Sequence, residues 1–267
     1  MLPVGALVCA LLVFRWVRDA LGFWQTYLAC AVGYLSHPLL DAYTTYGTEL
    51  FWPFSNVRVA WSTMAVADFL FTGPIVLLVV LAAVKRRARY ARIAVLWVFA
   101  YLAVAGVQAQ RAVTAGTELA ASRGHTPARI EVIPNLFSSL LLWKVVYEYD
   151  GRYYVDAART GFRATSIPGQ STPKLDVARD YPWLEPASQQ AADVERYRRV
   201  ARDMLAVDAE QPNRIVDLRY SLVPNEIAGF WAIVLDPAAP PAAHVGFIAT
   251  RENAPRDALR LIDMLFE

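Results

Sequence analysis

The chain has 267 residues, and 56% of them are hydrophobic, whereas soluble domains typically have roughly 45–50%. Its 26 Lys and Arg residues nearly balance its 24 Asp and Glu residues. Residues 110–267 alone contain 18 Lys or Arg and 20 Asp or Glu, a net charge of about −2 that gives no reason to expect a nucleic acid partner. The two cysteines, Cys9 and Cys30, lie in apolar stretches, which excludes a disulfide framework and a CxxC metal or redox motif.

The charged residues are distributed unevenly along the chain. Residues 1–109 contain only eight Lys or Arg and four Asp or Glu, whereas residues 110–267 contain eighteen and twenty. This contrast predicts a transmembrane helical domain over residues 1–110 and a water-soluble domain over residues 111–267.

Three apolar segments of the first part are candidate membrane spans, because a spanning helix needs roughly 20 mostly apolar residues. They are Gly22–Leu40, Thr63–Val84 and the shorter Ile93–Gln108. Leu2–Phe14 is also apolar, but as a helix it would span only about 20 Å, and it lacks the basic start and cleavage site of a signal peptide. The fold predicted for this part is an α-helical membrane bundle of three to four helices.

Two basic clusters predict the orientation of this bundle. Five Lys or Arg residues lie in the loop Lys85–Arg92, and Arg15 and Arg18 close the first helix. Both clusters should be cytoplasmic by the positive-inside rule, and they fall on the same side if the helices alternate. The loop His37–Ser62 and the whole C-terminal domain are therefore expected outside the cytoplasm.

The second part is expected to form a small α+β soluble domain. Val145–Tyr149 and Arg152–Val155, joined by Asp150-Gly151, have the pattern of a β-hairpin with a type I′ turn. Ala191–Leu205 has the periodicity of an amphipathic helix. The other expected elements are strands over Arg214–Leu222, Gly229–Leu235 and His244–Ala249, a closing helix over Arg256–Phe266, and a proline-rich loop over Pro168–Pro186.

The stretch that begins at His37 carries the residues best suited to chemistry. His37 and Asp41 are four residues apart, so on a helix they share one face. An imidazole and a carboxylate presented together suit a divalent cation of the zinc or manganese kind. The spacing also fits a plainer interpretation, in which His37 caps a helix at the membrane interface and Asp41 begins a loop.

Asp68 strengthens the metal interpretation. It is expected about six residues into the span Thr63–Val84, where an ionisable group usually faces a partner or a wet cavity. The predicted topology puts Asp68 on the same side as His37 and Asp41, so these three side chains are the candidate metal ligands. The competing explanation is a salt bridge between Asp68 and Arg58.

The other candidates are weaker. His125 and His244 stand alone and are expected to be ordinary surface or packing residues. The Trp52-Pro53-Phe54 segment is typical of an interfacial aromatic anchor. No Gly-x-Ser-x-Gly, P-loop or Rossmann fingerprint occurs, so the serine hydrolase, nucleotide and dinucleotide classes lose their usual support.

The order of these motifs resembles a known family. The block HPLLDAYTTYGTELFWPFS, then Arg58 and Asp68, a basic loop and the segment FSSLLLWKVVYEYDGRYYV resemble the YdjM-like (DUF457) bacterial inner-membrane metal-dependent hydrolases. The resemblance implies a multi-pass protein of the bacterial inner membrane with His37, Asp41 and Asp68 as metal-site residues. Members of that family normally carry an upstream PDxD segment and an HRGxTHS motif. This sequence has neither, so it is expected to lack the N-terminal part and its additional ligands.

The function predicted from these features is hydrolysis at the membrane surface. A divalent metal ion, zinc or manganese, held partly by His37, Asp41 and Asp68, would activate a water molecule. The location suggests a lipid or other amphiphilic ester or phosphoester as substrate, with membrane lipid as the partner. The alternative is a non-enzymatic or inactive membrane-anchored protein that presents an extracytoplasmic binding domain.

Overall fold

The computed structural model describes residues 2–135, 138–249 and 254–266. The chain divides into two compact units, Met1–Met64 and Ala65–Glu267.

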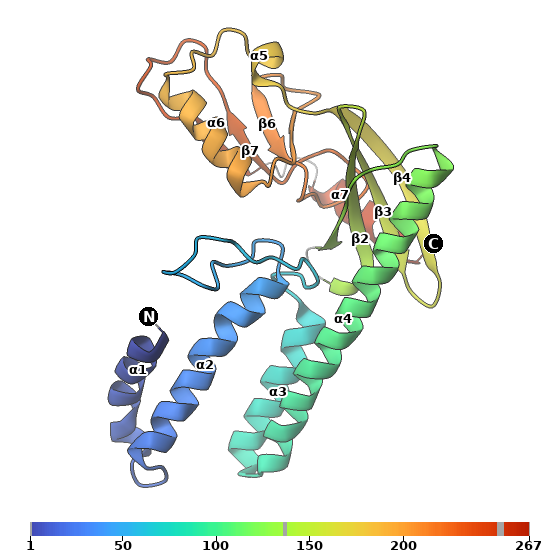
Figure 1. Ribbon diagram of the computed structural model, residues 1–267. Coiled ribbons are helices and arrows are strands. Elements are labelled where there is room, and N and C mark those ends of the chain that lie inside the picture. The colour runs from blue at the N-terminus through green and yellow to red at the C-terminus, as the bar shows by residue number, and fades with distance from the viewer. Residues whose placement is uncertain (1, 136–137, 250–253, 267) are drawn as a thin grey trace. The chain divides into compact units, whose positions relative to one another are not determined.

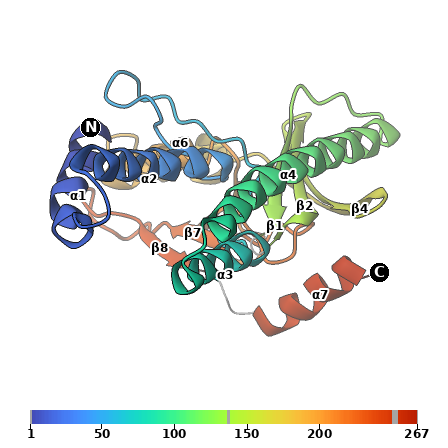
Figure 2. The ribbon, with the colours of Figure 1, turned by 90° about the horizontal axis from the view of Figure 1, so that it is seen from below.

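The first unit is a hairpin of two helices followed by a folded loop. Helices α1 (Leu2–Val17) and α2 (Phe23–Tyr43) lie side by side (Figures 1 and 2). A glycine allows their close approach, since a β-carbon on Gly5 would lie 2.7 Å from a ring carbon of Tyr34. Helix α2 includes the segment expected to hold His37 and Asp41 on one helix, so that expectation is confirmed.

The loop after α2 folds back onto the C-terminal end of that helix. The Trp61 N–H donates to the Ala42 carbonyl at 2.7 Å, and Thr48 and Val59 exchange two backbone hydrogen bonds of 2.9 and 2.8 Å. Gly47 has a φ of +63°, and a β-carbon there would lie 2.2 Å from the Val59 carbonyl oxygen. This turn therefore requires glycine.

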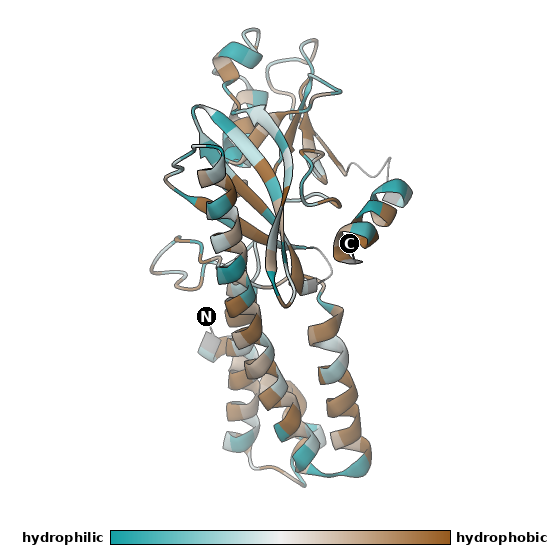
Figure 3. Ribbon diagram, turned by 90° about the vertical axis from the view of Figure 1, so that its right-hand side faces the viewer, coloured by the Kyte–Doolittle hydropathy of each residue, from teal (hydrophilic) through white to brown (hydrophobic). Residues whose placement is uncertain are grey.

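The second unit begins with a helical hairpin, α3 (Phe69–Lys85) and α4 (Ala88–Ser122), whose helices lie side by side (Figures 1 and 2). Hydrophobic residues dominate α3 and the first part of α4 (Figure 3). The 35 residues of α4 correspond to about 52 Å, more than the roughly 30 Å hydrocarbon core of a bilayer. Among the described residues, α4 is the one helix long and apolar enough to cross a membrane, whereas Pro3–Val17 and Phe69–Lys85 are apolar but shorter.

The predicted span Thr63–Val84 begins too early. Helix α3 starts at Phe69, and Asp68 is its N-cap with extended φ and ψ of −93° and 105°. Aspartate is favoured at this position because its carboxylate accepts hydrogen bonds from N–H groups of the first helical turn. The expectation that Asp68 lies six residues inside a helix is therefore wrong.

The third predicted span, Ile93–Gln108, lies inside α4, which extends further in both directions. The helix continues without a break past residue 110. The division into a transmembrane domain and a soluble domain at that residue stays a prediction, and α4 is the element that would connect the two domains.

Two four-stranded antiparallel sheets follow α4, each with its strands in sequential order. The first sheet consists of β1 (Ile130–Asn135), β2 (Ser138–Tyr149), β3 (Arg152–Thr160) and β4 (Ala164–Pro173). The second consists of β5 (Leu205–Val207), β6 (Arg214–Asp217), β7 (Trp231–Val234) and β8 (Gly246–Ala249). The predicted strands of the second sheet exist but are shorter than expected.

The hairpin between β2 and β3 is confirmed. Tyr149 pairs with Arg152, and the two turn residues between them, Asp150 and Gly151, have φ values of 51° and 68°. Positive φ at both central residues is the requirement of a type I′ turn, which aspartate followed by glycine meets at low cost.

The remaining helices correct the predictions in part. Helix α6 (Gln189–Val200) confirms the amphipathic helix but ends before Leu205. The closing helix is confirmed as α7 (Ala254–Phe266). The proline-rich loop expected over Pro168–Pro186 is wrong in part, because its first residues belong to β4 and the helix α5 (Val177–Asp180) follows.

Apolar clusters join these elements into layers. Small residues of α4 pack on one face of the first sheet, in the cluster Ala109, Ala112, Ala115, Trp143, Val145 and Ala158. The other face packs on the second sheet, in a cluster that includes Val146, Val155, Val216 and Leu218. Helix α6 covers the far face of the second sheet with Val194 and Tyr197. Figure 1 shows α4 running along the first sheet.

Candidate functional site

His37 and Asp41 lie one helical turn apart near the C-terminal end of α2. The His37 side chain is exposed and that of Asp41 is partly buried. Within the described part of the chain, neither side chain takes part in a hydrogen bond or an ion pair. Pro38 lies between them and cannot donate to the Tyr34 carbonyl. The pair therefore presents an imidazole and a carboxylate whose ligating atoms have no partner among the residues that the structure describes.

The backbone around this pair is fixed by the loop that follows it. The Asp41 carbonyl accepts hydrogen bonds from the Thr44 N–H and hydroxyl at 2.9 and 2.8 Å. Arg58 donates to the Gly47 carbonyl at 3.1 Å and lies 3.7 Å from a carboxylate oxygen of Glu49. Arg58 thus has partners within its own unit.

Asp68 differs from the other two candidates, because its side chain is 3% exposed and densely hydrogen-bonded. Its Oδ1 accepts from the Leu70 and Phe71 N–H groups, both at 3.1 Å. Its Oδ2 accepts from the Tyr101 hydroxyl at 2.6 Å, and from the Ser139 hydroxyl and N–H at 2.5 and 3.0 Å. The carboxylate therefore connects the start of α3 to α4 and β2.

These five donors bear on whether Asp68 can hold a metal. An ionised carboxylate offers about four lone-pair sites. The five donors around Asp68, which we call the Asp68 shell, therefore already fill the acceptor capacity of this carboxylate. Ligation of a cation at Asp68 requires at least one of these hydrogen bonds to be exchanged. His37 and Asp41 suit a divalent ion, because they are an imidazole and a carboxylate without partners among the described residues. Asp68 suits such an ion only after one of its hydrogen bonds has been exchanged.

No group of three or more His, Cys, Asp or Glu residues comes together in the part of the chain that the structure describes. Catalytic zinc sites usually have three protein ligands and a water molecule. The pair on α2 has two side chains of the types that serve as such ligands.

The two isolated histidines have local partners. His125 Nδ1 lies 3.1 Å from the Tyr147 hydroxyl, and its ring stacks on Tyr149 with centroids 4.3 Å apart. His244 Nδ1 lies 2.8 Å from an Asp193 carboxylate oxygen. Each therefore has a packing or hydrogen-bonding role of its own.

The structure buries one further titratable group, Lys144, that no motif of the sequence singles out. Lys144 lies in the middle of β2 and is 3% exposed. In the sequence, Lys144 is the single lysine inside the apolar run Leu140–Val146. A strand with one exposed face alternates polar and apolar residues, so this run indicates a strand that is buried on both faces, with Lys144 inside.

One comparison with known proteins found a match to part of the chain. Residues 1–112 match the family model described as YdjM inner membrane protein. That range holds α1 to α3, most of α4, and the residues His37, Asp41 and Asp68, but none of the strands. No curated protein and no solved structure matches the chain.

Proposed function

We propose that the chain is a metal-dependent hydrolase of the inner membrane, because residues 1–112 match the family model described as YdjM inner membrane protein. His37 and Asp41 hold its divalent ion, zinc or manganese, and Asp68 is the third protein ligand. The observation that carries the proposal is the pair on α2, whose side chains share a helix face and have no partner among the described residues. A partly buried carboxylate on an apolar helix is expected to have a counter-charge, and a cation would supply it.

Asp68 has a defined part in this proposal. Two of its five donors are hydroxyl groups, those of Tyr101 and Ser139, and hydroxyls reorient more easily than backbone N–H groups. We propose that Oδ2, whose partners include these two hydroxyls, is the Asp68 atom that would help to hold a cation, while the two N–H groups of α3 keep Oδ1 in place. Tyr101 and Ser139 would then position the ligand.

A bound divalent ion would supply Lewis acidity and lower the pKa of a coordinated water. The residues of the chain supply the binding site and its orientation. Loop 44–64 holds the end of α2 through the Trp61 and Thr63 backbone hydrogen bonds to Ala42 and Tyr43. A site near a membrane surface suggests a lipid or other amphiphilic ester or phosphoester as substrate.

Metal content tests the proposal. The full chain, purified in detergent and loaded with zinc or manganese, should retain a stoichiometric amount of metal after gel filtration, measured by mass spectrometry of the elements. H37A and D41N should each lose most of it, because each removes one of few ligands. H125A and H244A are the matched controls and should bind metal like the wild type. A wild-type protein that retains no metal, or loss of metal only in the controls, contradicts the proposal.

We also propose that the protein crosses the membrane several times and that the domain after α4 is extracytoplasmic. The support is the basic loop between α3 and α4, Lys85–Arg92, which the positive-inside rule assigns to the cytoplasm. Alkaline phosphatase fused after Glu267 should be active in cells, because this reporter folds only outside the cytoplasm. An inactive phosphatase combined with an active cytoplasmic reporter at the same position would reverse the topology.

We also consider a second function, that of a membrane anchor without catalysis in its membrane part. The hydrogen bonds around Asp68 favour it. These five hydrogen bonds connect α3, α4 and β2, as a rigid support for the soluble domain requires. In that case the protein is a membrane anchor that presents an extracytoplasmic binding domain. The metal-content experiment separates the two functions, since an anchor binds no stoichiometric metal.

A further inference from the structure

Lys144 is buried in a way that calls for an explanation. Its side chain lies on the face of β2 that turns away from α4, next in alternation to the core residue Val146. The Nζ donates to the Ser221 hydroxyl oxygen at 2.9 Å and to the carbonyls of Pro224 and Glu226 at 3.1 and 2.8 Å. Among the described residues, no carboxylate lies within ion-pair distance of this amine. Buried lysines are rare without such a partner.

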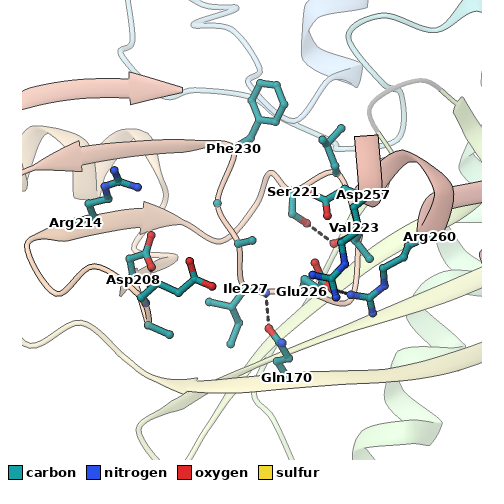
Figure 4. A pocket seen from close by; sticks show the side chains of 16 residues that line it. Gln170, Asp208, Arg214, Ser221, Val223, Glu226, Ile227, Phe230, Asp257 and Arg260 are labelled. Carbon is teal, nitrogen blue, oxygen red and sulfur yellow. Dashed lines mark hydrogen bonds and ion pairs between the residues drawn. The ribbon is translucent and has the colours of Figure 1, made fainter. Parts of the chain in front are cut away.

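Ser221 connects this amine to a cavity. The serine follows β6 on the segment Leu218–Phe230 and is 7% exposed. It lines a pocket of about 380 Å³ (Figure 4). The pocket wall also includes apolar side chains of Val223, Ile227 and Phe230. The wall of the pocket therefore includes the hydroxyl group of Ser221, which is hydrogen-bonded to the buried amine of Lys144.

Burial favours the neutral form of the amine. Burial lowers the pKa of Lys144 to about 7, although the carboxylates of Asp217 and Glu226 act in the opposite direction. Both carboxylates have arginine partners: Arg219 binds Asp217 at 2.7 Å, and Arg260 binds Glu226. These guanidinium groups lie against the two carboxylates, and burial outweighs the carboxylates in setting the pKa of Lys144.

The hydrogen-bond geometry suits either protonation state. An ammonium has three N–H groups for the three oxygens around it. A neutral amine has two, which can serve the Pro224 and Glu226 carbonyls, and a lone pair that can accept the Ser221 proton. The Ser221 hydroxyl now donates to the Val223 carbonyl at 2.7 Å, and rotation about one bond turns it to Lys144.

We propose that Ser221 and Lys144 are a nucleophile and general base that hydrolyse a carboxylic ester bound in this pocket. Serine–lysine pairs are a known variant of serine nucleophile activation. The site is separate from the metal site proposed on α2 and does not depend on it.

The reaction proceeds in two balanced halves. The Lys144 amine takes the hydroxyl proton as Ser221 Oγ attacks the ester carbon, and the carbonyl electron pair moves to oxygen. Collapse of this adduct breaks the carbon–oxygen bond to the alcohol, which leaves with the proton from Lys144. In the second half, water attacks the acyl-serine while Lys144 takes a proton from it. Collapse returns that proton to Ser221 Oγ and releases the carboxylic acid.

Acylation by p-nitrophenyl acetate tests this proposal on the full chain in detergent. We expect release of nitrophenol and an acetyl group on Ser221, located by peptide mass spectrometry. S221A should abolish that adduct, and K144M should slow acylation by about 100-fold or more, as expected for loss of a general base. S188A and K174M are the matched controls and should react within about twofold of the wild type. Ser188 is buried like Ser221 but has no lysine partner in the described part of the chain.

Two further readouts keep the test decisive. In the wild type, the acylation rate should increase with rising pH through a single ionisation near pH 7. This measurement uses the wild type alone, so it holds even if K144M does not fold. Chelators and the variants H37A and D41N should leave acylation unchanged, so failure of the metal proposal and failure of this one are distinguishable. Absence of acetyl-Ser221 in the wild type, or an acylation rate without that pH dependence, would overturn the proposal.

Discussion

Replacing Asp68 by alanine should destabilise the second unit by at least about 3 kcal/mol. The substitution removes an acceptor with five hydrogen bonds and leaves the Ser139 and Tyr101 donors unsatisfied in a buried place. Each buried donor without a partner costs about 1–3 kcal/mol. The loss of the N-cap of α3 adds about 1 kcal/mol. Chemical denaturation of the detergent-solubilised protein, followed by tryptophan fluorescence, measures the change.

Asp41 provides the matched control for this substitution. Its side chain has no hydrogen bond or ion pair among the described residues, so D41A should change the free energy of unfolding by less than about 0.5 kcal/mol, as is typical of positions without specific partners. D68N should lower the free energy of unfolding by an amount between those of D41A and D68A. Its amide keeps one acceptor oxygen but turns an NH₂ group toward hydrogen-bond donors. If D68A were as stable as D41A, the shell would not be a structural connection.

The stability that Lys144 contributes should depend strongly on pH. Burial lowers its pKa in the folded protein to about 7, whereas a lysine in an unfolded chain titrates near 10.4. Between these two pH values the unfolded chain binds a proton that the folded protein has released, so the free energy of unfolding rises with pH. From pH 6 to pH 9, the wild type should gain about 2–3 kcal/mol relative to K144M.

Lys174 is the control for this pH dependence. Partial burial would lower its pKa, but hydrogen bonds to Asp203 and Glu148 outweigh burial, and the pKa is raised. A lysine with a raised pKa stays protonated in both states from pH 6 to pH 9. The difference in stability between the wild type and K174M should therefore be constant over that range. A constant difference for K144M as well would mean that Lys144 remains charged in the folded protein.

Local patterns in the sequence predicted the elements whose causes are local. The β2–β3 turn followed from Asp150-Gly151, because few other residue pairs accept positive φ twice. The core-facing residues Val194 and Tyr197 of α6 followed from helical periodicity. His37 and Asp41 share a helix face for the same reason.

Elements that depend on tertiary context do not follow from local patterns in the sequence. Prolines argued against a strand at Pro168 and Pro173, yet both belong to β4. This strand lies at the edge of the first sheet, where a missing N–H is tolerated. Its residues are mostly exposed, so it lacks the apolar alternation that reveals a strand with one buried face.

The partners of the buried polar groups were also beyond local patterns. Ser139 is 71 residues from Asp68, and Ser221 is 77 residues from Lys144. No spacing rule connects positions so far apart. Asp68 was assigned to the interior of a helix because apolar residues surround it on both sides, and its role as an N-cap depends on where α3 begins.

The most direct test of the metal proposal is pulsed electron paramagnetic resonance of the Mn²⁺-loaded protein. The chain has three histidines, His37, His125 and His244, so the double variant H125Q/H244Q leaves His37 as the one imidazole. Our account predicts that this variant still shows the coupling of a directly coordinated histidine nitrogen to manganese. It also predicts that H37Q, with the other two histidines present, does not. A coupling that persists in H37Q, or that is absent from the wild type, would contradict the assignment of the metal to His37.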